Sequence, residues 1–406
     1  MARIRCDRSS EACARRLSRA SEPRVIRSLL AAVPLLIWLY LLLARGGFWR
    51  VAHHFLPCPA NGQLARRVVA IIPARNEAAV IGSAVRSLLR QNFGGSIHII
   101  LVDDGSTDGT EAAAVEAADS TGASAQLTVI SGAALAPGWS GKVWAMSQGV
   151  VASVALSPDY LLFTDADIDH DPDDVALLVG NAEALDRDLV SCMVKLETAA
   201  FPERCLIPAF VFFFFKLYPP RWVGSVEHST AAAAGGCMLM RPEGLARIGG
   251  LRAIRSQIID DCALARAVKA AGGSIWLGLS RSARSTRGYG SFAEIGRMIS
   301  RTAFNQLRHS YLLLALTLLG LYLTYLLPPL LLLSGHALPM ALGAAAWLLM
   351  CVGYAPMLRF YGLSALWSLC LPAVALFYSA ASIHSAVKYR FGRGGQWKGR
   401  VQDLPA

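Results

Sequence analysis

The sequence predicts an α/β domain with a doubly wound sheet, flanked by transmembrane helices. Short β-branched runs such as Val68–Ile72 and Ile97–Val102 are typical of buried parallel strands, and a helical pattern over Glu77–Arg90 separates them. Apolar runs of about 20 residues, the length that spans a bilayer, lie on both sides of this region. Of the 406 residues, 54% are hydrophobic and only 17% are charged, which is too apolar for an ordinary soluble enzyme.

The composition excludes a disordered chain, a collagen-like repeat and a small disulfide scaffold. The net charge of +11 suits anionic lipid headgroups or nucleic acid. Because the basic residues flank the apolar runs, we expect a membrane partner and no nucleic acid. The nine cysteines include no C-x-x-C pair, so free thiols in a reducing compartment are expected rather than a zinc site.

The apolar runs and the basic ends divide the chain into predicted segments. A basic extension occupies residues 1–24 and an anchor helix residues 25–45, and a basic tail follows at 389–406. The central domain is expected at 66–309 and further membrane segments at 310–388. The four predicted spans are Val25–Ala44, Tyr311–Leu333, Ala337–Leu358 and Leu363–Ala386, and the prolines at 328 and 329 predict a kink in the second.

Polar clusters follow three predicted strands of the central domain. We expect further strands at Leu127–Ile130 and Tyr160–Phe163. Ligands of such sheets bind at the carboxyl ends of the strands, so these clusters should meet in one crevice. They comprise Pro73, Arg75 and Glu77 after the first strand, Asp103 and Asp104 after the second, and Asp165 and Asp167 after the fourth.

Each cluster taken alone has a structural explanation. Asp and Gly residues after Asp103 favour turns and helix caps, and Arg75 and Glu77 could form a surface ion pair. A calcium loop is excluded because His170 and Ala176 stand where Gly and Glu are required. The sequence contains no P-loop motif, and no G-x-G-x-x-G follows the first strand.

A further acidic pair, Asp260 and Asp261, opens a predicted helix that runs to Ala271. One of the two could simply cap the helix. The other would lie beside the crevice, where its carboxylate could accept a proton. Adjacent acids are costly unless a metal, a cation or a substrate hydroxyl lies near.

The order of these motifs resembles the family 2 glycosyltransferases, inverting enzymes with a GT-A nucleotide-sugar-binding domain. The resemblance covers residues 68–309 and includes Gly141–Ala145 (GKVWA). The membrane helices resemble the lipid-modifying branch, such as ceramide glucosyltransferases. Four segments look like the hopanoid-biosynthesis-associated glycosyltransferases, namely Leu206–Pro219, Ala231–Met240, Ile258–Leu264 and Gln396–Arg400.

The resemblance implies roles for the motif residues. Asp165 and Asp167 would hold Mg²⁺ or Mn²⁺, and Asp261, with Asp260 beside it, would be the catalytic base. Lys142 and Arg308 are expected to meet phosphate charge, although Lys142 could be merely solvated. The nucleoside of the donor would be held by Pro73, Arg75, Glu77, Asp103 and Asp104.

Processive relatives carry Q-x-x-R-W, but here Asn305–His309 reads NQLRH, which favours a single transfer over polymer synthesis. A lipid acceptor, hopanoid or another polyisoprenoid, fits two segments expected at the membrane surface, 207–223 and 290–309. Packed core is the alternative for the first of them.

The implied location is the cytoplasmic (inner) membrane of a bacterial-type cell, as a multi-pass protein whose catalytic domain faces the cytoplasm. Both basic ends should be cytoplasmic by the positive-inside rule, yet four full spans would place the central domain outside. A monotopic first segment, a re-entrant C-terminal segment or an unused upstream start would each resolve this conflict.

Two other function classes stay open. A sugar-nucleotidyltransferase would need a Gly-rich basic loop after the first strand, which Pro73–Glu77 does not supply. A non-catalytic scaffold or transporter component could bind nucleotide only, although the predicted spans hold few ionisable residues.

Overall fold

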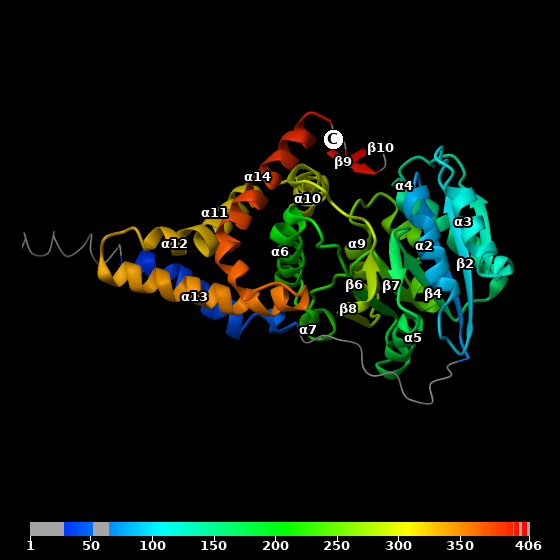
Figure 1. Ribbon diagram of the computed structural model, residues 1–406, viewed down its shortest axis with the longest axis horizontal. Coiled ribbons are helices and arrows are strands. Elements are labelled where there is room, and N and C mark those ends of the chain that lie inside the picture. The colour runs from blue at the N-terminus through cyan, green and yellow to red at the C-terminus, as the bar shows by residue number, and fades with distance from the viewer. Residues whose placement is uncertain (1–27, 52–64, 393, 398–399, 404–406) are drawn as a thin grey trace, which may run out of the picture.

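The computed structural model describes residues 28–51, 65–392, 394–397 and 400–403. The predicted extension 1–24 and parts of the tail 389–406 lie outside these residues. Figure 1 shows a β-sheet with its helices at one end of the molecule and long helices at the other, with α6 and α10 between them.

An eight-stranded sheet in the order β3-β2-β1-β4-β7-β6-β8-β5 forms the first part. Its strands are β1 (Arg67–Ala74), β2 (Ser96–Asp103), β3 (Leu127–Ser131), β4 (Tyr160–Thr164), β5 (Ile168–His170), β6 (Leu189–Lys195), β7 (Cys237–Met240) and β8 (Ile275–Ser285). The first four strands pair in parallel, as the sequence predicts. The predicted α/β fold is confirmed, and its sheet is mixed in the other half, because β7 and β5 are antiparallel to their neighbours. These two strands are too short for a sequence period to reveal them.

Helices cover both faces of the sheet because side chains of β1 alternate between two cores. Val69 and Ile71 pack in the core that contains Met146 of α4, and Ala70 and Ile72 pack in the core that contains Ile81 of α2. The helices of this part are α2 (Ala78–Leu89), α3 (Thr110–Asp119), α4 (Gly141–Ser153), α5 (Asp174–Ala184), α7 (Pro220–Val223), α8 (Pro242–Arg247) and α9 (Asp260–Ala270).

Helix α6 (Phe201–Leu217) is an internal element and not a free surface segment. Phe212 is fully buried and lies 5.1 Å from Tyr354, and Phe213 lies 4.9 Å from Tyr378, both measured between ring centroids. The packed-core alternative is therefore correct for this face of 207–223. Helix α10 (Phe292–Gln306) within 290–309 is amphipathic, and Ile295 is buried on its inner face.

Within the described residues, three helices are long and apolar enough to span a membrane, namely Tyr311–Leu331, Ala337–Phe360 and Ala365–Arg390. They comprise α11 (Tyr311–Leu321), a π-helical turn (Tyr322–Leu326), α12 (Leu327–Leu331), α13 (Ala337–Phe360), a 3-10 turn (Ala365–Cys370) and α14 (Leu371–Arg390). A π-helical turn directly precedes Pro328 and Pro329, where the sequence predicts a kink.

The predicted first span, Val25–Ala44, corresponds to a shorter apolar helix, Ser28–Leu43, of fewer than 18 described residues. It packs beside α13, where a Cβ added to Gly353 would lie 2.9 Å from Leu42. The indole nitrogen of Trp38 donates a hydrogen bond of 2.8 Å to the carbonyl of Thr324 in the π turn. A small hairpin of β9 (Gly394–Trp397) and β10 (Arg400–Asp403) follows α14.

Candidate functional site

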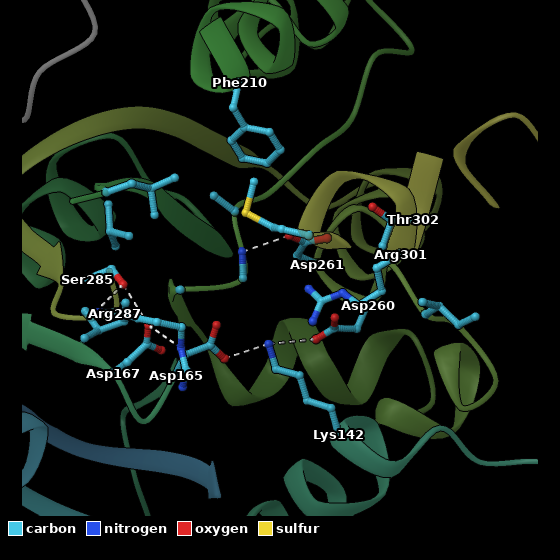
Figure 2. A pocket seen from close by; sticks show the side chains of 18 of the residues that line it. Lys142, Asp165, Asp167, Phe210, Asp260, Asp261, Ser285, Arg287, Arg301 and Thr302 are labelled. Atoms are coloured by element: carbon cyan, nitrogen blue, oxygen red, sulfur yellow. Dashed lines mark hydrogen bonds and ion pairs between the residues drawn. The ribbon is translucent and has the colours of Figure 1, made fainter. Parts of the chain in front are cut away.

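A cavity of about 810 Å³ opens at the carboxyl ends of β1 and β4, where sequence reasoning placed the crevice. Figure 2 shows its polar floor, with Phe210 of α6 on the opposite side. Helix α10, the end of α14 and β9 complete its wall. The residues that line it include Pro73, Glu77, Lys142, Asp165, Asp167, Phe210, Phe214, Asp260, Asp261, Arg287, Tyr289, Arg297, Met298, Arg301, Lys388 and Gly395.

Lys142, at the start of α4, connects two acidic motifs. Its Nζ lies 2.7 Å from Oδ1 of Asp165 and 3.6 Å from Oδ2 of Asp260. Burial alone would lower the pKa of Lys142, but these two carboxylates outweigh it and raise the pKa, so the side chain stays charged. The solvated alternative for Lys142 is therefore wrong.

Asp261 lies in the first turn of α9, and Ile259 is the N-cap, so neither acid of the pair is the cap residue. The backbone N–H of Gly235 donates to Oδ2 of Asp261 at 2.9 Å, and that of Cys262 donates to Oδ1 at 2.6 Å. Burial, followed by the charge of Asp260, raises the pKa of Asp261 to about 6. A carboxyl group with this pKa is ionised at neutral pH and still basic enough to accept a proton.

The turn between β4 and β5 carries Asp165 and Asp167. Oδ2 of Asp167 accepts a hydrogen bond of 2.7 Å from Ser285 and lies 3.4 Å from Nε of Arg287. Burial and the nearby charge of Asp165 raise the pKa of Asp167, as is expected where two carboxylates share a small volume. The other end of the Arg287 guanidinium binds Glu77, and Arg75 pairs with Asp104, so the structural alternative of an Arg75–Glu77 pair does not apply.

Four predicted site residues do not line the cavity: Arg75, Asp103, Asp104 and Arg308. The first three lie at the adjacent ends of β1 and β2, where Arg75 pairs with Asp104 at 3.6 Å. Arg308 is exposed and follows the end of α10 in a left-handed conformation with φ 51°. Arg308 follows α10, which ends at Gln306, and does not line the cavity, whereas Arg301 faces it (Figure 2).

The donor set of the β4–β5 turn fits a divalent cation. Asp165 and Asp167 offer carboxylate oxygens, the hard ligands that Mg²⁺ and Mn²⁺ prefer. A second group, His170, Asp174 and Cys237, has potential ligand atoms within 4.8 Å of one another. Both ring nitrogens of His170 already make hydrogen bonds, to Thr164 and to Asp174, so we interpret this group as a buried hydrogen-bond network.

Sequence reasoning missed Arg287 and Ser285, which hold Asp167, and Arg301 of α10. The first two come to the site only because β8 pairs with the three-residue strand β5. No local spacing in the sequence indicates that contact. Arg301 does belong to the amphipathic pattern of 290–309, and its helical period could have placed it on the cavity face.

Comparisons with known proteins bear on the family and the fold of the domain that contains this cavity. Residues 69–249 match the sequence model of the family Glycosyl transferase family 2. The solved structure of the mannosyltransferase PcManGT from Pyrobaculum calidifontis, in complex with GDP-Man and Mn²⁺, is 18% identical. The alignment covers 89% of this chain and 98% of that chain with a TM-score of 0.52, which shows a shared fold.

Glucosyl-3-phosphoglycerate synthase from Mycobacterium tuberculosis, in complex with Mn²⁺, UDP and glucosyl-3-phosphoglycerate, is 22% identical. The alignment covers 61% of this chain and 81% of that chain with a TM-score of 0.39, too low to support an argument. No curated protein sequence gives a significant match. Residues 69–249 therefore carry a domain of glycosyl transferase family 2, built on a GT-A-like mixed α/β sheet.

Proposed function

We propose that this protein is an inverting glycosyltransferase that moves one sugar from a nucleoside diphosphate donor to a hydroxyl group of a membrane lipid. One observation carries the proposal: a single cavity holds the paired carboxylates Asp165 and Asp167, the half-buried acid Asp261 and the apolar side chains of Phe210 and Phe214. The family match of residues 69–249 supports a nucleotide-sugar donor.

The donor would occupy the end of the cavity near β1 and β4. Asp165 and Asp167 would hold Mg²⁺ or Mn²⁺, which neutralises charge on the departing diphosphate. Pro73 and Glu77 line this end, and Lys142 adds positive charge there. The resemblance assigns the nucleoside to Pro73 and Glu77 together with Arg75, Asp103 and Asp104.

Asp261 is the proposed base of the transfer. Its carboxylate takes the proton of the acceptor hydroxyl, whose oxygen forms a bond to the anomeric carbon. The bond from that carbon to the diphosphate oxygen breaks, and the nucleoside diphosphate leaves with the electron pair. Since the hydroxyl attacks opposite the leaving group, the configuration at the anomeric carbon inverts. General base catalysis of this kind contributes roughly 10²–10⁴ in rate.

A lipid acceptor is supported by the apolar wall of the cavity. Phe210 and Phe214 of α6 and Met298 of α10 line it, next to helices long enough to span a membrane. The resemblance to the hopanoid-associated enzymes favours a hopanoid or another polyisoprenoid alcohol as the acceptor.

Helix packing supports a particular membrane topology. The ring of Phe304 in α10 lies 5.1 Å from that of Tyr311, at the start of α11, and 5.4 Å from that of Tyr389, at the end of α14. The helices from α11 to α14 therefore leave the domain and return to it at the same place. Trp367, before α14, lies 5.8 Å from Phe201 at the start of α6. Both ends of Ala365–Arg390 therefore contact the domain, and we infer that this helix lies along the membrane surface.

The other two long helices, Tyr311–Leu331 and Ala337–Phe360, would cross as a hairpin that returns to the cytoplasmic side, and Figure 1 shows them extending together away from the sheet. Cysteine labelling in intact cells tests this topology, with the exposed Cys370 replaced by Ser. We expect an impermeant thiol reagent outside the membrane to label Ser334→Cys but not Phe391→Cys. External labelling of Phe391→Cys would contradict the inferred topology.

The function is tested by incubating the purified protein with Mn²⁺, a panel of nucleotide sugars and a bacterial lipid extract that contains hopanoids. Mass spectrometry should find a lipid that gains one sugar, and Asp261→Asn should not produce it. A non-catalytic scaffold would instead bind the nucleotide without turnover. A sugar-nucleotidyltransferase would join a nucleoside triphosphate to a sugar phosphate and release diphosphate from the triphosphate. Turnover that survives in Asp261→Asn would remove Asp261 as the base.

A further inference from the structure

A buried hydrogen-bond network lies directly behind the β4–β5 turn. Nδ1 of His170 lies 2.7 Å from Oδ2 of Asp174, and both side chains are fully shielded from solvent. Nε2 of His170 lies 3.0 Å from Oγ1 of Thr164, the residue before Asp165. Ser282 donates to the second oxygen of Asp174 at 2.5 Å. Every polar atom of the His170 ring therefore has a partner.

The directions of these bonds follow from the donors available. The hydroxyl of Thr164 donates to the carbonyl of Gly236 at 2.9 Å, so its oxygen accepts from Nε2–H of His170. On the other side of the ring, Nδ1 forms a hydrogen bond with the carboxylate of Asp174. The ring is thus held at both nitrogens, and it fixes the rotamer of Thr164.

The carbonyl of Gly236 joins this network to both parts of the site. Besides Thr164, it accepts from the backbone N–H of Asp165 at 3.4 Å. The preceding residue, Gly235, donates its N–H to Oδ2 of Asp261 at 2.9 Å. The segment is tightly packed, because a Cβ at Gly235 would lie 3.3 Å from both Asp261 and Lys142 and would require them to shift.

We propose that His170 is a positioning residue, which acts through Thr164 and the Gly235–Gly236 segment to fix the acidic β4–β5 turn relative to Asp261. The inference rests on the proposed function, since it assigns the metal to that turn and the base role to Asp261. Outer partners that orient metal ligands commonly change metal affinity or activity by about 10–100-fold when they are removed.

The test compares two substitutions on the same strand. Thr164→Val removes the hydroxyl at the carboxyl end of β4, where it joins the site. Tyr160→Phe removes a hydroxyl at the other end, where it donates to Glu183 at 2.7 Å away from the cavity. Thr164→Ser keeps the hydroxyl and should restore the wild-type behaviour.

Mn²⁺ binding by each full-length variant is measured in the presence of UDP or GDP, as the loss of the free Mn²⁺ signal in electron paramagnetic resonance. The thermal unfolding of each variant is measured separately. We expect Thr164→Val to bind Mn²⁺ about tenfold more weakly, while Tyr160→Phe binds normally even if its melting temperature falls equally. Normal Mn²⁺ binding by Thr164→Val, or equal weakening in Tyr160→Phe, would overturn the positioning role alone.

Two other results would also overturn the inference. Stoichiometric zinc in the purified protein would show that the His170 group ligates a metal and does not form the proposed network. A wild-type protein that binds no Mn²⁺ with either nucleotide would refute the proposed function, and the positioning role with it.

Discussion

The pH dependence of turnover tests the role of Asp261 most directly. Burial and the charge of Asp260 raise the pKa of Asp261 to about 6, so the base is protonated and lost as the pH falls through that value. A group with a pKa of about 6 is roughly nine-tenths ionised at pH 7 and one-tenth ionised at pH 5. We therefore expect kcat to fall about tenfold between pH 7 and pH 5, measured at saturating Mn²⁺ and donor.

Two variants separate this effect from general acid sensitivity. Asp260→Asn removes the neighbouring negative charge and should move the midpoint of the pH profile below that of the wild type. Asp169→Asn alters a half-buried carboxylate of β5 that does not line the cavity, and it should leave the profile unchanged. A wild-type kcat that is constant from pH 5 to pH 8, with the chemical step rate-limiting, would refute the assignment of Asp261 as the base.

Three further predictions follow from other contacts. Chelation of divalent cations should abolish turnover and Mn²⁺ should restore it, since the acidic β4–β5 turn is the proposed metal site; turnover that survives chelation would contradict this. Arg287→Ala should raise the KM of the donor about tenfold, because two carboxylates that line the site lose a shared partner, and Arg287→Lys should rescue it only in part. Gly353→Leu should destabilise the folded protein by about 1–3 kcal/mol, because the new side chain overlaps the helix Ser28–Leu43. Gly320→Leu should not, because a Cβ there meets no atom within 4 Å, and equal thermal shifts of the two variants would refute this.

The parallel half of the sheet could be predicted because each strand is a continuous apolar run followed by polar residues. The ends of β1 and β4 gave Glu77, Asp165 and Asp167, and the start of α9 gave Asp260 and Asp261, all of which line the cavity. Local pattern was sufficient there because each residue lies within a few positions of a strand or helix end.

The mixed half of the sheet, formed by β7, β6, β8 and β5, and its contribution to the site could not be predicted. Arg287 reaches Asp167 through a strand pairing between residues more than a hundred positions apart, and no local period encodes such a contact. The position of Arg308 could not be predicted for a different reason: it follows the end of α10, and it does not line the cavity. Arg301, less than two turns earlier, lies on the facing side.

The part of the cavity wall formed by α14 and β9 limits which fragments of the protein can be studied. Lys388 and Gly395 line the cavity, yet they lie far beyond the residues 69–249 that match the family. Lys388 lies near the end of α14 and Gly395 follows it, so both are synthesised after the helices Tyr311–Leu331 and Ala337–Phe360. A soluble fragment trimmed to the sheet would thus retain the acidic floor but have an open cavity on the acceptor side. Such a fragment would suit measurements of nucleotide and metal binding, whereas studies of the acceptor need the full chain in a lipid environment.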